Sequence, residues 1–123
     1  MSVALVENAE IFLTGLPIPP SLNNAYVNVP GRGRVPSVPL TKWRRSCGFM
    51  INAKRPSPVL GPVHLSYTFE DGGSRADIGN LEKAATDLLV ELRLIEGDSP
   101  KFVRSIHLQW GSVDGMQIEV RAA

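Results

Sequence analysis

Residues 75–89 read RADIGNLEKAATDLL and contain the clearest helical pattern in the chain. Apolar side chains recur at i, i+3, i+4, i+7, i+8 and i+11, at Leu81, Ala84, Ala85, Leu88, Leu89 and Leu92. This spacing places them on one face of a helix, so we expect that face to pack against a sheet or a second helix. Asp77 opens the pattern, where an N-cap or first-turn acid is favourable.

A polar flank lies beside the apolar face. Asn80, Lys83 and Asp87 share this flank because residues three and four positions apart lie above one another on a helix. Asp98 follows in the turn EGDSP, just beyond the expected end of the helix. Carboxylates with a nearby lysine suit a divalent metal held beside a phosphate. Each residue also has an ordinary explanation: Asp77 as a cap, Lys83 with Asp87 as an exposed ion pair, and Asp98 as a turn residue.

This combination resembles the RusA family of Holliday junction resolvases. In that family an arginine-rich approach precedes the pattern Asp-x-Asp-Asn-x-x-Lys-x-x-x-Asp, and a further Asp stands in the next turn. The matching positions here are Asp77, Asn80, Lys83, Asp87 and Asp98, with Arg75 in the approach. The N-terminal segment Pro19-Pro20-Ser21-Leu22-Asn23-Asn24 is similar to the family's Pro-Pro-Ser-x-Asn entry. With the order of elements added, the resemblance covers most of the chain.

The resemblance implies a structure-selective endonuclease that resolves four-way DNA junctions by Mg²⁺-dependent phosphodiester hydrolysis. It also implies a homodimer that places two sites on opposite strands. Asp77 and Asp98 would bind Mg²⁺ as catalytic carboxylates, Lys83 would contact the scissile phosphate, and Asn80 and Asp87 would support them. The expected DNA contacts are Asn24, Arg32, Arg34, Arg44, Arg45 and Arg75.

Gly79 departs from the family pattern, because the family has its second Asp there. A magnesium site with one carboxylate fewer binds the ion more weakly. Glu82 lies three residues later on nearly the same helical face, so it either replaces the missing metal ligand or is an ordinary surface glutamate. If nothing replaces that ligand, the chain is a junction-binding protein with weak or no cleavage. A small structural protein without a DNA role is a third possibility.

The charges are divided unevenly along the 123 residues, although the net charge is only +1. No acidic residue occurs between Ile11 and Phe69. The basic residues in that interval are Arg32, Arg34, Lys42, Arg44, Arg45, Lys54 and Arg55. A basic half beside an acidic half suits a protein that grips phosphates with one part and holds metal with the other. Cations that are merely dispersed and solvated would give the same count.

Several other classes are disfavoured by composition. The single cysteine, Cys47, excludes an intrachain disulfide and a cysteine zinc cluster. The apolar runs are too short to span a membrane, and the N-terminus lacks a signal-peptide pattern, so we expect a cytoplasmic protein. His64 and His107 are expected on the exposed faces of strands. No glycine-rich phosphate loop is present, so we expect no nucleotide cofactor.

The remaining pattern predicts a single α+β domain over residues 1–123, with a small β-sheet, two main helices and the order β-α-β-α-β-β. Strands are expected at 11–16 and 63–69, and then at 106–110 and 116–120 joined as a hairpin. A first helix is expected from a Thr41 cap to about Lys54, burying Trp43, Cys47, Met50 and Ile51. Residues 28–39, rich in Gly and Pro, are expected to form a mobile basic loop.

Overall fold

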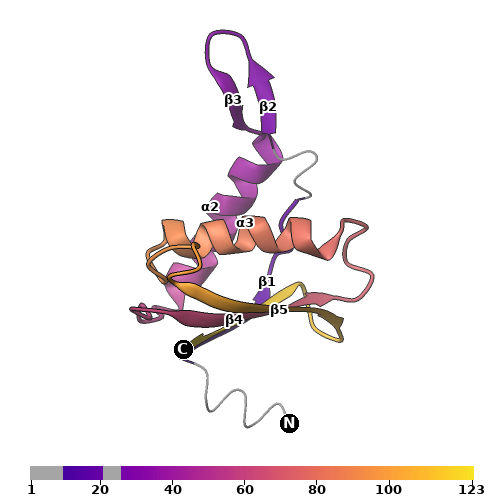
Figure 1. The fold of residues 1–123 in the computed structure, drawn as a ribbon. Helices are drawn as coiled ribbons and strands as arrows, with labels where there is room; N and C mark the ends of the chain where they lie inside the picture. Colours follow the sequence, from indigo (N-terminus) through magenta and orange to yellow (C-terminus); the bar gives the residue numbers. More distant parts are fainter. Residues whose placement is uncertain (1–9, 21–25) are drawn as a thin grey trace.

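The computed structural model describes residues 10–20 and 26–123. In these residues two helices and two small sheets are present, and Figure 1 shows how they are arranged. In chain order the elements are β1 (Ile11–Leu16), β2 (Tyr26–Val29), β3 (Gly33–Pro36), α2 (Val38–Ala53), β4 (Val63–Glu70), α3 (Ile78–Glu91), β5 (Val103–Gly111) and β6 (Met116–Ala122). The predicted α+β class with two main helices is confirmed. Within the described part of the chain, no helix is long and apolar enough to cross a membrane.

The main sheet has the strand order β1-β6-β4-β5. Strand β4 pairs antiparallel with β6 and parallel with β5, and the parallel partners are joined through α3. The predicted hairpin between the last two strands is therefore wrong, because β4 lies between them. The physical reason is burial: Val63, Leu65, Tyr67 and Phe69 of β4 are almost fully enclosed, so this strand takes a central position with a neighbour on each side.

The link from β5 to β6 crosses the carboxyl end of β4. Backbone hydrogen bonds hold it there: the Glu70 N–H donates to the Gly115 carbonyl at 2.8 Å, and the Asp71 N–H donates to the Gly111 carbonyl at 3.0 Å. Gly115 has φ +63°, and a Cβ there would lie 2.0 Å from the Leu16 carbonyl oxygen. Glycine is required at this crossing, because any other residue would collide with β1.

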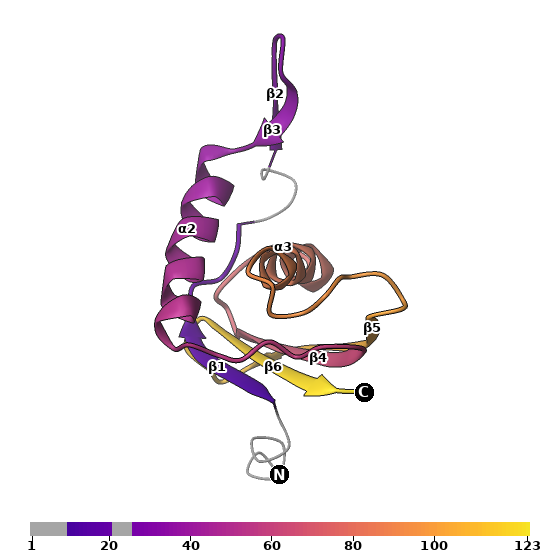
Figure 2. The same cartoon turned by 90° about the vertical axis from the view of Figure 1, so that its left-hand side faces the viewer.

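Both helices pack on the same face of the main sheet (Figure 2). The core between them contains Ile11, Leu13, Leu16, Leu40, Trp43, Cys47, Ile51, Val59, Val63, Leu65, Tyr67, Phe69, Leu81, Ala84, Ala85, Leu88, Leu89, Leu94, Ile95, Met116, Ile118 and Val120. Helix α2 passes close to α3 at Gly48, where a Cβ would lie 3.6 Å from the Leu92 Cδ2 atom. That is an ordinary van der Waals distance, so the packing of the two helices does not require glycine at position 48.

Helix α2 begins earlier than predicted, and its buried face is shifted. The N-cap is Ser37, whose Oγ accepts the Leu40 N–H at 3.3 Å, rather than Thr41. Pro39 lies in the first turn, where the backbone nitrogen has no hydrogen-bond partner within the helix, so proline is tolerated there. The helix can therefore begin within the Gly/Pro-rich stretch. Trp43, Cys47 and Ile51 are buried as predicted. The predicted burial of Met50 is wrong, because Met50 is 37% exposed and Leu40 is part of the core instead.

Residues 26–36 form an antiparallel β-hairpin that we call the arm, so most of the mobile loop predicted at residues 28–39 is a paired ribbon instead. Figures 1 and 2 show the arm projecting from the body of the molecule beside the start of α2. Val27 pairs with Val35, and Gly31 and Gly33 adopt positive φ angles in the turn. These β-branched residues favour extended backbone and the glycines allow the reversal, so regular pairing replaces the expected loop.

Candidate functional site

The middle of α3 carries a connected set of charges. Lys83 Nζ lies 3.1 Å from Asp87 Oδ1 and 3.4 Å from Asp98 Oδ2. The turn after the helix therefore brings Asp98 close to Lys83 on the polar flank. The hydrogen bond to Asp87 is the main reason that the pKa of Lys83 is raised, and Asp98 adds to it. All three groups are partly solvated, so these ion pairs contribute little stability.

Asp77 occupies the N-cap position of α3, but its carboxylate makes no capping hydrogen bond. The backbone alone closes the first turn, since the Asn80 N–H donates to the Asp77 carbonyl at 3.0 Å. The Asp77 side chain is exposed, and Asn80 is half-buried. The predicted N-cap position of Asp77 is therefore confirmed, although its side chain makes no capping bond; the exposed carboxylate lies at the positive end of the helix dipole.

Gly79 lies in the first turn of α3 with open space around it. A Cβ built there meets no atom within 4 Å, and its φ lies outside the left-handed region. Neither packing nor backbone conformation requires glycine at this position. The Cβ of an aspartate, which the RusA pattern has here, would therefore meet no neighbour.

Glu82 is turned away from Gly79. Its Oε2 accepts a hydrogen bond from the Thr86 hydroxyl at 2.5 Å, one turn toward the C-terminus. The Thr86 oxygen also lies 2.8 Å from the hydroxyl of Tyr67, which is buried in β4. Because Thr86 has one proton and gives it to Glu82, Tyr67 must be the donor in the second bond. Burial raises the pKa of the Tyr67 hydroxyl, so that donor keeps its proton.

These side chains do not fit a complete magnesium site. Among the described residues, no three acidic, histidine or cysteine side chains are grouped as a metal would need. Asp98 is paired with Lys83, Glu82 is held by Thr86, and Gly79 supplies no ligand. Mg²⁺ demands near-octahedral oxygen ligands at about 2.1 Å, so one exposed Asp77 carboxylate is a poor binding site.

The predicted DNA-contact cations fall on three places. Arg32 and Arg34 are exposed on the arm, Arg44 and Arg45 lie in the second turn of α2, and Arg75 is exposed just before α3. Asn24 lies outside the described residues.

The α2 cations line a groove of about 460 Å³ between the two helices, together with Pro36, Thr41, Leu88, Glu91 and Leu92. Arg44 Nε lies 4.0 Å from Glu91 Oε1 on α3. Pro36, the last residue of the arm, lines the groove, so the groove begins where the arm joins α2.

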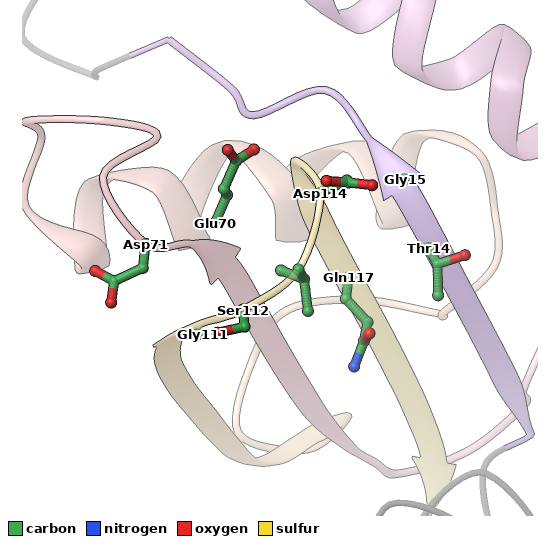
Figure 3. A pocket seen from close by; sticks show the side chains of 9 residues that line it. Thr14, Gly15, Glu70, Asp71, Gly111, Ser112, Asp114 and Gln117 are labelled. Atoms are coloured by element: carbon green, nitrogen blue, oxygen red, sulfur yellow. The ribbon is translucent and has the colours of Figure 1, made fainter.

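Sequence reasoning missed a larger hollow at the carboxyl end of β4. Figure 3 shows this pocket of about 620 Å³, where Glu70, Asp71 and Asp114 contribute carboxylates from β4 and from the link between β5 and β6. Glu70 Oε1 accepts the Gly115 N–H at 2.8 Å, so one carboxylate braces the crossing link. The three acids are spread over 45 positions of sequence. The observed pairing of β5 with β4, which the sequence did not predict, brings them to one pocket.

The histidines occupy the places predicted for them. His64 and His107 point to the sheet face opposite the apolar side chains of β4 and β5, and His64 Nδ1 lies 2.6 Å from Ser105 Oγ. Cys47 is buried, and burial raises the pKa of its thiol to about 12. A thiol with that pKa is not a nucleophile near neutral pH.

Comparison with known proteins gives no independent assignment, since neither the models of protein families nor the curated protein sequences contain a match to this chain. The relation to the RusA family therefore rests on the motif residues alone.

Proposed function

We propose that this protein binds four-way DNA junctions as a RusA-like protein whose carboxylate set is short of a full nuclease centre. The observation that carries the proposal is the arrangement of charge. The projecting arm carries the exposed Arg32 and Arg34, and Arg44 and Arg45 at the start of α2 line a groove that begins at the base of the arm and reaches α3. Phosphate binding by arginine and lysine supplies most of the affinity for DNA.

The arm supports DNA binding through its shape as well as its charge. A two-stranded antiparallel ribbon fits into the major groove of DNA. Arg34 lies on β3 and Arg32 in the turn, where both side chains are exposed. A homodimer, which the family resemblance implies, would bring two arms to one junction.

Weak or absent cleavage follows from the residues of α3. Gly79 lacks the carboxylate of the family pattern, and Glu82 does not turn toward that gap. Lys83 already neutralises Asp98 through a 3.4 Å contact. A divalent ion at Asp98 would share the carboxylate with that lysine, and the nearby positive charge would lower the affinity for the ion.

A magnesium-dependent junction endonuclease is the second candidate. Two observations favour it: Asp98 returns to the side of α3 on which Lys83 lies, and Asp77 presents a carboxylate free of any capping bond. Nicking of a labelled four-way junction in Mg²⁺, lost in Asp77→Asn, would select this candidate over the binding protein.

The binding proposal is tested with a labelled four-way junction and a linear duplex of matched length at 50 and 200 mM salt in EDTA. The wild type should prefer the junction. The double variant Arg32→Gln/Arg34→Gln should lose about 2 units of log–log salt slope, roughly one per phosphate contact.

Lys101→Gln is a matched control, because Lys101 is an exposed cation in the turn before β5, away from the arm. It should retain junction affinity. Equal affinity of the wild type for junction and duplex, or an unchanged salt slope in the arm variant, would contradict the proposal.

A further inference from the structure

The groove between α2 and α3 is cationic on one side and largely apolar on the other. Its α2 wall contains Arg44 and Arg45, whereas its α3 wall contains Leu88 and Leu92, which lie one helical turn apart. Figure 1 shows the arm above the place where α2 crosses α3, and Pro36 at the end of the arm also lines the groove. The groove therefore offers positive charge and an apolar contact side by side.

The backbone of DNA would use only part of this groove. Its phosphates would bind the arginines, but the backbone is polar and anionic throughout, so nothing in it matches Leu88 and Leu92. A bulky apolar side chain matches them, because removing apolar surface from water is favourable. The groove volume of about 460 Å³ lies within the range of roughly 300–1,000 Å³ that is usual for ligand sites. The groove is thus large enough for side chains of a partner.

The two arginines present positive charge at two places. Arg44 lies toward α3, where its Nε is 4.0 Å from Glu91 Oε1. Arg45 is exposed, and consecutive residues of a helix point in directions about 100° apart. A ligand with one anionic group would contact one of them, whereas a peptide with several carboxylates can contact both. Among the described residues that line the groove, Glu91 is the single acid, so positive charge is in excess.

We propose that the groove between α2 and α3 binds an acidic segment of a partner protein that carries bulky apolar side chains between its carboxylates. The apolar side chains would pack on Leu88 and Leu92, and the carboxylates would pair with Arg44 and Arg45. Charge complementarity favours an acidic partner over a basic one, and the apolar wall favours a peptide over a nucleic-acid backbone. This inference goes beyond junction binding and does not depend on it.

Fluorescence anisotropy with the full chain and no DNA tests the proposal. The probe is a fluorescein-labelled peptide, Gly-Asp-Asp-Leu-Asp-Phe-Asp-Gly, and the control peptide has serine in place of both apolar residues. The wild type should bind the probe. It should bind the serine peptide at least about tenfold more weakly, because two apolar side chains are no longer buried.

The basic wall is tested by the double variant Arg44→Gln/Arg45→Gln. It should weaken probe binding by about tenfold or more, because the charge-assisted hydrogen bonds to the peptide are lost. Lys54→Gln/Arg55→Gln is the matched control, since it removes two exposed cations at the other end of α2. The control variant should bind the probe like the wild type.

Three results would overturn the proposal: no binding of the probe by the wild type, an equal loss of affinity in the two double variants, or equal affinity for the probe and the serine peptide. The last result would mean that the groove binds charge alone, as it would bind a DNA backbone. The arm variant Arg32→Gln/Arg34→Gln should bind the probe like the wild type. A failure of junction binding through the arm is therefore distinguishable from a failure of this proposal.

Discussion

The polar side chains in the middle of α3 are held by hydrogen bonds and ion pairs, whereas the acid that opens its first turn makes no capping bond. In the first turn, Asp77 makes no capping bond and Gly79 borders open space. In the middle of the helix, Lys83 lies between the carboxylates of Asp87 and Asp98. Glu82 accepts a hydrogen bond from Thr86. One helix therefore contains an end free to accept a ligand and a segment whose groups already hold each other.

The difference explains what a single glycine does here. The family pattern would put a carboxylate at position 79, which lies between Asp77 and Lys83 in the sequence. Residues four positions apart are neighbours on a helix, so an acid at 79 would compete for Lys83. Without that competitor, Lys83 pairs with Asp87 and Asp98. On the proposed function, this pairing would weaken metal binding at the flank.

Breaking the satisfied segment should have the largest effect on stability. Thr86→Val removes the hydroxyl that joins Tyr67 to Glu82 and leaves the buried Tyr67 donor without a partner. We expect a loss of about 2 kcal/mol in the free energy of unfolding, measured by urea titration.

Tyr67→Phe is the matched comparison for Thr86→Val. It removes the phenol but leaves the Thr86–Glu82 bond intact, so the loss should be about 1 kcal/mol. The double variant should be less destabilised than the sum of the two single variants. Additive losses would show that the three side chains do not act as a chain.

Filling the open end should raise stability. Gly79→Ala adds a methyl group that meets no atom within 4 Å, and alanine is the better helix former. The free energy of unfolding should rise by up to about 1 kcal/mol. A decrease would mean that position 79 is more crowded than its surroundings indicate.

Lys83→Gln should have the smallest effect, about 0.5 kcal/mol or less, because its ion pairs are solvated. A pKa raised in the folded state contributes stability at pH values below the ordinary value of 10.5. This contribution declines as the pH rises through the raised pKa. The difference in unfolding free energy between wild type and variant should thus be constant from pH 7 to 9 and shrink above pH 10.5. A difference that grows in alkali would contradict the pairing.

Local patterns predicted the elements that depend on near neighbours. The spacing of Leu81, Leu88 and Leu89 predicted α3, and the alternation of Val63 to Phe69 predicted β4, because each pattern reports which face is buried. The contact between Asp98 and Lys83 depends on the turn after α3, and no local pattern in the sequence predicts it.

The pairing of the strands and the directions of the side chains could not be predicted from the sequence. The strands ending at Gly111 and starting at Met116 looked like a hairpin, and only the burial of β4 shows that they flank it. The sequence does not indicate toward which end of α3 the Glu82 side chain turns. Its direction is set by the hydrogen bond from Thr86, which also contacts the buried Tyr67. Tertiary contacts of this kind carry no local signature.

The most direct test of the account is cleavage of a labelled four-way junction in Mg²⁺ by the wild type, Gly79→Asp and Gly79→Ala. The account predicts junction binding by all three, little nicking by the wild type and Gly79→Ala, and at least about a tenfold increase in nicking by Gly79→Asp. The gain should disappear when Asp77→Asn is added. Efficient cleavage by the wild type, or no gain in a Gly79→Asp protein that still binds the junction, would contradict the claim that glycine at position 79 leaves the carboxylate set incomplete.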